Sequence, residues 1–356
     1  MYRQSVNRLL GGAAVVVLSA GLGAGGSAAG SPAGRLLVVA VHDHESGGVN
    51  YPSDVLVVDA DGRHLRRLTH DNAANGPAEW MPDGRRIIFQ SHPGNTDRGA
   101  AHIYVINTDG TGRRRLTSAS GGALPDVSPD GRRIAFLIVR PKEWPDSREW
   151  GVYVMDASGR RQRRLVGGRG AAPSGPTWSP DGRMLMFVTA SRTADSLFVI
   201  NGDGTGLTRL ERNANLDAAA WAPRGRTLAI EHFDTDSDSL TIADLHRHLG
   251  RPLLRPVNKI RQIWPGAYEW SPDGRSIIYQ NDAGVWVVDA RGQARRRRFA
   301  VQALPRTWSP DRHWMVFASF RQRFIQVATA SGRERRVLTR KIENCCPIDE
   351  IEWAPR

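Results

Sequence analysis

Two kinds of short apolar run alternate along the chain between polar, glycine-containing turns. The first kind includes Arg86–Phe89 and Ser276–Tyr279, and the second, which ends in Asp or Asn, includes Ile103–Asn107 and Val152–Asp156. Runs this short that are rich in β-branched and aromatic side chains predict strands rather than helices. We therefore expect an all-β fold.

A proline-containing turn precedes each run of the first kind and gives the sequence its period. The turn reads Trp-Ser-Pro-Asp-Gly or a close variant and recurs about every 45 residues. Its seven copies lie at 79–84, 127–131, 178–182, 221–225, 270–274, 308–312 and 353–356. Proline presets the turn, aspartate can bond the backbone locally, and glycine accepts a positive φ. The tryptophan can wedge between neighbouring units, so seven units of four strands predict a β-propeller.

The two ends of the chain together supply the strands of one unit. The sequence ends in an innermost strand at Glu350–Trp353, and the first strand after the N-terminal segment lies at Arg35–Ala40. Third and fourth strands follow at Asp54–Asp59 and Leu65–Thr69. Pairing the ends removes the open sheet edges that a linear array would expose. We predict a seven-bladed β-propeller of four-stranded blades, closed by one C-terminal and three N-terminal strands.

Residues 1–29 predict a secretory signal peptide. Arg3 and Arg8 precede an apolar, glycine-rich stretch at Leu9–Gly25, and small residues follow at a cleavage position. Residues 30–356 then form the propeller, and we expect the protein to be exported to the periplasm or the cell exterior. No later apolar run is long enough for a spanning helix, so we expect no integral membrane span. We also expect a monomer.

The formal charge of +13 comes almost entirely from arginine, since Lys142, Lys259 and Lys341 are the only lysines. A basic chain can bind nucleic acid, anionic lipid or acidic polysaccharide, but export disfavours nucleic acid as the partner. Many arginines fall on the outermost strand expected in each blade, as at Arg113–Arg115. Charge there discourages pairing with other sheets. The alternative role of this arginine rim is adhesion to an anionic wall polymer.

The repeat as a whole resembles a known family. The Trp-Ser-Pro-Asp-Gly turn, the Val-Tyr-Val-Met-Asp run at 152–156 and the Arg-Leu-Thr ending at 115–117 resemble the WD40-like repeats of TolB-like exported proteins. The resemblance covers 35–356 and implies a non-catalytic propeller. Such a propeller would bind a protein or glycan partner on its loop face, which carries the loops between second and third strands and between successive blades. The repeat is also similar to that of oligogalacturonate lyases, which makes a polysaccharide lyase the enzymatic alternative. It is similar to the propellers of prolyl-oligopeptidase-type peptidases, but their Gly-x-Ser-x-Gly elbow is missing here.

Histidines and carboxylates on the loops between blades are the candidate ligand-binding residues. They are His42, Asp43, His44, His70, Asp71 and His92 near the closing unit, and Glu231 and His232 across the ring. His42 and His92 share one repeat offset, so we expect them side by side on adjacent blades. Such groups can bind metal or do acid–base work, or they can simply face water. We assign no catalytic residue, no metal ligand and no cofactor.

Cys345 and Cys346 are the only cysteines, and their adjacency limits the bond they can form. Adjacent Cα atoms lie ~3.8 Å apart across a trans peptide, below the ~4.4–6.8 Å of ordinary disulfides. We predict a strained vicinal disulfide in the exported protein, the alternative being a free or metal-bound pair. Titration of the unreduced, denatured protein should detect no thiol, and two free thiols per chain would reject the disulfide.

Overall fold

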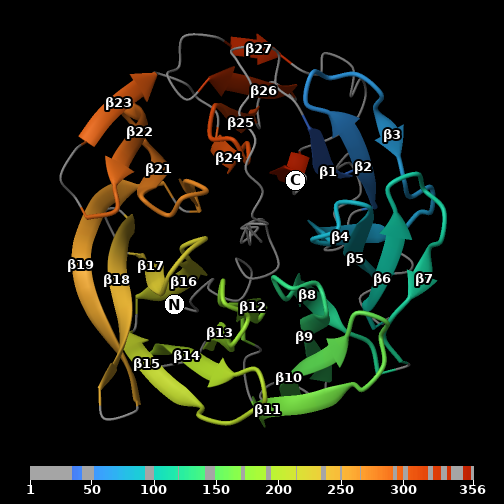
Figure 1. Ribbon diagram of the computed structural model, residues 1–356, viewed down its shortest axis with the longest axis horizontal. Helices are drawn as coiled ribbons and strands as arrows, with labels where there is room; N and C mark the ends of the chain where they lie inside the picture. Colours follow the sequence, from blue (N-terminus) through green and yellow to red (C-terminus); the bar gives the residue numbers. More distant parts are fainter. Residues whose placement is uncertain are drawn as a thin grey trace, which may run out of the picture.

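The strands form seven antiparallel sheets of four that close into a ring, as Figure 1 shows, so the predicted seven-bladed propeller is confirmed. Every regular element among the described residues of this computed structural model is a strand. The described residues are 34–41, 52–92, 100–118, 120–140, 149–169, 173–189, 194–213, 215–233, 238–248, 251–264, 266–291, 295–299, 304–319, 324–329, 335–337 and 348–353.

Each blade runs from an innermost to an outermost strand. The closing blade contains β28 (Ile348–Trp353), β1 (Arg35–Val41), β2 (Ser53–Asp59) and β3 (Arg66–Arg67). Blade 1 contains β4 (Ala74–Trp80), β5 (Arg86–His92), β6 (His102–Asn107) and β7 (Arg114–Arg115). Blade 2 contains β8 (Ala123–Val127), β9 (Arg133–Arg140), β10 (Glu149–Asp156) and β11 (Arg163–Arg169). Blade 3 contains β12 (Thr177–Trp178), β13 (Met184–Thr189), β14 (Asp195–Asn201) and β15 (Thr208–Asn213).

Blades 4 to 6 follow in the same order around the ring. Blade 4 contains β16 (Leu216–Trp221), β17 (Thr227–His232), β18 (Asp238–His248) and β19 (Arg251–Ile263). Blade 5 contains β20 (Tyr268–Trp270), β21 (Ser276–Asn281), β22 (Gly284–Asp289) and β23 (Arg295–Phe299). Blade 6 contains β24 (Leu304–Trp308), β25 (Trp314–Ser319), β26 (Phe324–Thr329) and β27 (Arg335–Val337). The first-to-second and third-to-fourth strand connections lie on one face, the turn face. The remaining connections lie on the opposite face, the loop face.

The ring is closed by the pairing that the sequence predicts. β1 pairs antiparallel with β2 on one side and with β28 on the other, from Leu36 opposite Trp353 to Ala40 opposite Ile348. Leu36 and Val38 of β1 also pack against Val316 of blade 6. Backbone hydrogen bonds therefore hold the closing blade together from both ends of the chain, and apolar packing joins it to blade 6.

The apolar core is divided among the seams between blades. The described residues form seven clusters of buried side chains, and each cluster joins two neighbouring blades. Four of the turn tryptophans, Trp80, Trp178, Trp270 and Trp308, are at most 7% exposed. Each packs against the blade that precedes it, as Trp80 does against Leu37 of the closing blade. The expected wedge between blades is confirmed at these four positions.

Arginines at the start of second strands cover two of these indole rings. The Arg133 guanidinium lies 4.3 Å from the ring centre of Trp178 and donates a 2.7 Å hydrogen bond to the carbonyl oxygen of Gly182. Arg35 does the same at the seam between the closing blade and blade 1, above Trp80 and to the carbonyl of Gly84. Each arginine therefore combines a cation–π contact with a bond to the next blade.

The Ser-Pro-Asp-Gly turn is held by the side chains that define it. Ser128 Oγ donates to Asp130 Oδ1 at 2.6 Å and accepts the N–H of Arg133 at 2.9 Å. Asp130 Oδ1 also accepts the N–H of Arg132, and Gly131 has a φ of 68°. The serine–aspartate bond recurs in the turns at 178–182, 270–274 and 308–312. The turn chemistry inferred from the sequence is therefore present.

The residue before the turn tryptophan, or before Val127 in blade 2, faces the opposite seam, because side chains alternate along a strand. Glu79 Oε2 accepts the N–H of Val127 at 3.0 Å, and Asp126 Oδ2 accepts the N–H of Trp178 at 2.7 Å. Both carboxylates thus bind the innermost strand of the following blade. Burial raises the pKa of Asp126 to about 8, although the N–H of Trp178 lowers it.

Deletion of residues 350–356 should lower the melting temperature far more than the loss of a seven-residue tail normally does. The deletion removes most of β28, so β1 loses its inner partner and the ring opens. Thermal unfolding followed by circular dichroism measures the effect. A chain that ends at Trp353 is the matched control and should melt like the parent. Equal melting of the two truncated chains would contradict closure by β28.

Candidate functional site

Asp71 lies on the connection that carries the chain from the closing blade to blade 1. Its Oδ1 accepts a 2.8 Å hydrogen bond from Asn75 Nδ2, and its Oδ2 lies 2.7 Å from Arg113 Nη1. Burial alone would raise the pKa of Asp71, but the hydrogen bonds from Asn75 and Arg113 and the Arg113 charge hold it below its usual value. The neighbouring His70 is exposed on the loop face.

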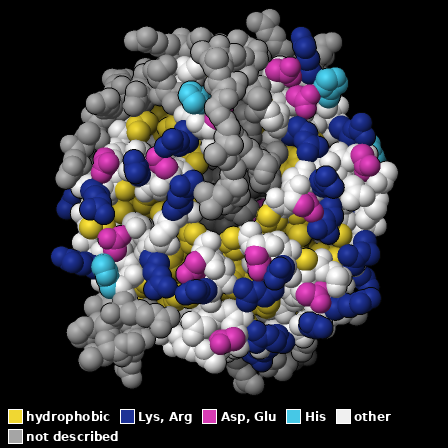
Figure 2. All heavy atoms as spheres, in the orientation of Figure 1, with side chains coloured by type: hydrophobic (Ala, Val, Ile, Leu, Met, Phe, Trp, Pro, Cys, Tyr) yellow, Lys and Arg dark blue, Asp and Glu magenta, His cyan; other side chains and the backbone are white. Residues whose placement is uncertain are grey.

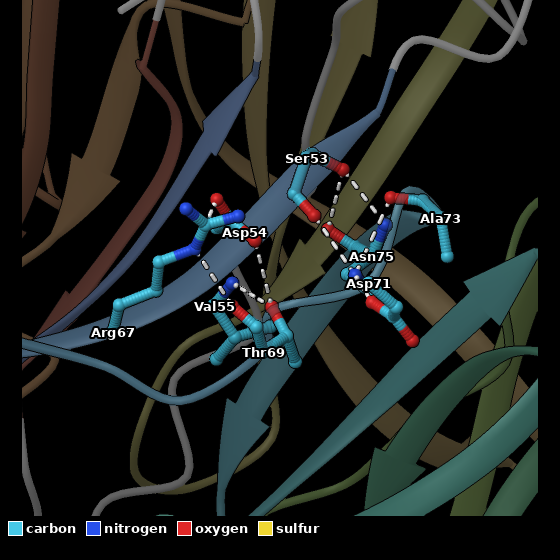
Figure 3. Close-up of polar contacts among 8 residues, drawn as sticks. All are labelled: Ser53, Asp54, Val55, Arg67, Thr69, Asp71, Ala73 and Asn75. Atoms are coloured by element: carbon cyan, nitrogen blue, oxygen red, sulfur yellow. Dashed lines mark hydrogen bonds and ion pairs between the residues drawn. The ribbon is translucent and has the colours of Figure 1, made fainter.

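A buried polar network joins this connection to β2, as Figure 3 shows. Asn75 Nδ2 donates to the carbonyl of Ser53 at 2.8 Å, and the Asn75 N–H donates to Ser53 Oγ at 2.7 Å. Thr69 Oγ1 bonds Asp54, whose other oxygen lies 2.7 Å from Arg67 Nε. Asp71 is thus a member of the scaffold, and His70 beside it is the residue presented to solvent.

His92 ends β5 on the loop face, and its side chain is half-buried beside the seam between blades 1 and 2. Its strand neighbour Gln90, two residues earlier, bonds the N–H of Leu124 in blade 2. His92 Nδ1 is buried, with no hydrogen-bond partner among the described residues. His102 lies close by on β6, and burial, followed by the charges of Arg115 and His92, lowers its pKa. His102 pairs with Ser91, so the two imidazoles leave their strands on opposite sides.

Five of the candidate residues lie outside the described part of the chain. They are His42, Asp43, His44, Cys345 and Cys346. The convergence of His42 with His92 therefore stays a prediction. So does the vicinal disulfide.

Glu231 and His232 are neighbours on β17 that serve different seams. Glu231 is 2% exposed, and its Oε1 accepts the N–H of Gly266 at 2.8 Å on the way into blade 5. His232 Nε2 lies 2.8 Å from Glu211 Oε1 of blade 3. Side chains at successive strand positions face opposite ways, so the two residues do not form one site.

Acidic groups that the sequence analysis missed surround Glu231. Burial raises the pKa of Glu231 to about 7; the N–H of Gly266 lowers it, whereas the charges of Asp217 and Asp238 raise it further. Burial and the charges of Glu231, Glu269 and Asp217 raise the pKa of Tyr268 well above its usual value. Asp238 ends an acid-rich stretch of the sequence, but nothing in the repeat pattern places Asp217 beside it.

Trp264 is an aromatic residue of the loop face that the repeat pattern also missed. It is 36% exposed, whereas the four buried tryptophans at the turns are at most 7% exposed. Its Nε1 donates a 2.8 Å hydrogen bond to Asp282 Oδ1 in the turn between β21 and β22. The available signal was its position outside the Trp-Ser-Pro-Asp-Gly landmark, because a tryptophan without a seam to fill has to lie elsewhere.

Arginines on the outermost strands form a second set of bonds between blades. Arg66 Nη1 donates to the carbonyl of Asp109, and Arg114 Nη1 donates to that of Ser158, both at 2.9 Å. Arg163 Nη1 repeats the bond one blade later, to Asp203. Figure 2 shows one face of the ring, on which basic and acidic side chains are interspersed around the blades. These arginines of the rim therefore help to hold neighbouring blades together.

The described residues hold neither a cluster of metal-ligating side chains nor a membrane-spanning helix. No group of three or more His, Cys, Asp and Glu side chains in this part of the chain is arranged to hold a metal ion. The same residues contain no helix that is long and apolar enough to cross a membrane.

Comparison with known sequences connects the repeat to one family. A family model described as the TolB beta propeller domain matches residues 6–224, more than half of the chain. An uncharacterized protein of Agrobacterium fabrum is 33% identical over 141 residues, covering 38% of this chain and 46% of that protein. The Tol-Pal system protein TolB of Alcanivorax borkumensis is 32% identical over 107 residues, covering 30% of this chain and 23% of TolB. The matches thus span less than half the length of these curated relatives.

Solved structures share the architecture. TolB from Acinetobacter baumannii superposes with a TM-score of 0.55 at 16% identity, over 92% of this chain and 68% of that chain. An oligogalacturonate lyase in complex with manganese superposes with a TM-score of 0.61 at 11% identity, over 80% of this chain and 87% of that chain. At these identities the likeness shows the fold alone.

The free energy of unfolding should fall as the pH rises from 5 to 7, in part because of Glu231. Its pKa is about 7 in the folded protein, against ~4.3 in an unfolded chain. The contribution is complete below the unfolded value and is lost as the pH rises through the folded value, a total change of about 4 kcal/mol. Glu231→Gln keeps an acceptor for Gly266 and should flatten this slope in urea unfolding between pH 5 and 8.

Glu211→Gln is the matched control in the adjacent seam. The hydrogen bond from His232 lowers the pKa of Glu211, with burial opposing it, so this carboxylate is ionised throughout the same pH range. Its replacement should leave the slope between pH 5 and 7 in place. An unchanged slope in Glu231→Gln would contradict the assignment to Glu231.

Proposed function

Because the chain belongs to the TolB β-propeller family, we propose that it is an exported, non-catalytic propeller that binds a protein or glycan partner on its loop face. Export is supported by the signal-like residues 1–29, which we propose are removed from the mature protein. Binding on the loop face is supported by the way in which the two faces of the ring use their polar groups.

The observation that carries the proposal is that the turn face is occupied in holding the ring together. Its aspartates, such as Asp130, bond the turns that contain them. Its arginines bond the neighbouring blade, as Arg114 and Arg133 do. On the loop face, by contrast, His70 and Trp264 project into solvent from connections that differ from blade to blade. Variable connections on a rigid scaffold are where binding residues concentrate.

We propose that the partner contacts the loop face around the junction of the closing blade and blade 1. His42, Asp43, His44, His70 and His92 belong to this region in the repeat order. Asp71 acts as a positioning residue, since its carboxylate joins Asn75 to Arg113 and fixes the backbone beside His70. Glu231 and His232 lie farther round the same face.

Two alternatives are tested alongside this proposal. A polysaccharide lyase is the enzymatic alternative, and the likeness to the manganese-bound lyase is a likeness of fold alone. The third possibility is adhesion to an anionic wall polymer through the arginine rim. The bonds made by Arg66, Arg114 and Arg163 weigh against it, because groups that join blades are less available to a polymer.

The proposal is tested by retention of the full chain on purified cell-wall sacculi and on immobilised polygalacturonate. His70→Ala/His92→Ala should weaken retention about tenfold or more, as expected when two direct polar partners are lost. Arg66→Ala/Arg114→Ala is the matched control on the turn face and should stay within about threefold of the parent.

The same assay separates the alternatives. Retention lost only in the arginine variant, and abolished by added salt, would contradict the loop-face proposal and favour adhesion through the rim. Release of unsaturated oligosaccharides from polygalacturonate would contradict the non-catalytic assignment. Loss of folding is monitored by circular dichroism of each variant.

A further inference from the structure

Trp264 is held rigidly although it is exposed. Its backbone N–H donates to the carbonyl of Gln280 at 2.9 Å, and its own carbonyl accepts the N–H of Ala267 at 3.0 Å. Its indole Nε1 donates to Asp282 at 2.8 Å. Two hydrogen bonds therefore fix the backbone of Trp264 and one fixes its indole ring, although the residue is 36% exposed. Such a ring forms a platform whose order is already present before a ligand binds.

Segments far apart in the sequence bring polar groups to this platform. The turn that contains Trp264 is tied to β17 by the 2.8 Å bond from the N–H of Gly266 to Glu231 Oε1. Asp217, at the inner strand of blade 4, is exposed and close enough to act electrostatically on both Glu231 and Tyr268. Asp282, which accepts the indole N–H of Trp264, is exposed on the turn between β21 and β22 of blade 5. Carboxylates from two blades therefore lie near the turn that carries the platform.

We propose that Trp264 is the stacking platform of a sugar-binding subsite that accepts pyranose rings without a carboxylate, with Asp217 and Asp282 as hydroxyl acceptors. The inference rests on the proposed function and gives the glycan partner a location and a chemical class. It places a contact at the seam between blades 4 and 5, away from the histidines of the closing blade.

The chemistry of the subsite follows from its shape and charge. A pyranose ring presents a face of C–H groups that packs flat on an indole, while its hydroxyls point outward in the ring plane. Carboxylate oxygens beside the indole can accept hydrogen bonds from two of those hydroxyls, and bonds to charged acceptors are the stronger kind. A uronic acid would bring its own negative charge toward Asp217 and Asp282, which are both exposed. The subsite should therefore disfavour galacturonate, which is the sugar of the lyase alternative.

The inference is tested by calorimetric titration of the full chain with three trisaccharides. These are the trimers of glucose and of N-acetylglucosamine, which are neutral, and of galacturonic acid, which is anionic. At least one neutral trimer should bind, and galacturonate should bind at least tenfold more weakly. Trp264→Ala should weaken the neutral trimer about tenfold, whereas Trp264→Phe, which retains an aromatic face, should stay within about threefold.

Two further variants act as controls. Leu207→Ala removes an exposed apolar side chain on the turn face and should leave binding unchanged. Asp217→Asn/Asp282→Asn keeps oxygen acceptors but removes two negative charges. It should therefore reduce the difference in affinity between the neutral trimer and the galacturonate trimer. Both tests leave buried core residues in place, so the variants are expected to fold.

The outcomes distinguish this inference from the proposed function. Binding of a neutral trimer that Trp264→Ala does not weaken would overturn the subsite. Failure of every neutral trimer to bind the parent would also overturn it. In either case the retention assay with His70→Ala/His92→Ala decides separately whether the loop face binds a partner.

Discussion

The seam between neighbouring blades is the interaction on which the rest of the structure depends. One inner strand supplies both sides of it: the turn tryptophan packs backward on the preceding blade, and the residue before it bonds forward to the next. Trp80 and Glu79 show the arrangement within two consecutive residues. Because a strand alternates its faces at every residue, a single dipeptide can join three blades. Repetition of that dipeptide position builds the ring.

Variation at one seam shows how its contacts depend on one another. Val127 takes the place of tryptophan in blade 2, so the arginine of the preceding blade has no indole to cover. That arginine, Arg86, instead forms a 2.7 Å ion pair with Asp83 in its own turn. Where the indole is present, Arg133 reaches across to Trp178. The arginine therefore bonds the next blade where a tryptophan gives it a surface to lie on.

The repeat made the ring predictable, because turn chemistry and apolar spacing are local properties of the sequence. Blade number, closure by β28 and β1, and the buried tryptophans all follow from that spacing. The surroundings of Glu231 did not follow, since they depend on which loops meet across a seam. Sequence order grouped Glu231 with His232, whereas the strand directs one toward Gly266 and the other toward Glu211. Residues that vary between repeats carry no periodic signal.

The division of labour between the two faces comes from the same geometry. Tight turns on the turn face bring arginine and aspartate within reach of the next blade, so their charge is used in bonds such as that from Arg114 to Ser158. The connections on the loop face follow no single pattern. Some bond the blades that they connect, as Asp71 does with Arg113 and Gly266 with Glu231, whereas His70 is exposed to solvent. Because the repeated turns and tryptophans already join the blades, these connections can differ from blade to blade, and recognition of a partner requires such a surface.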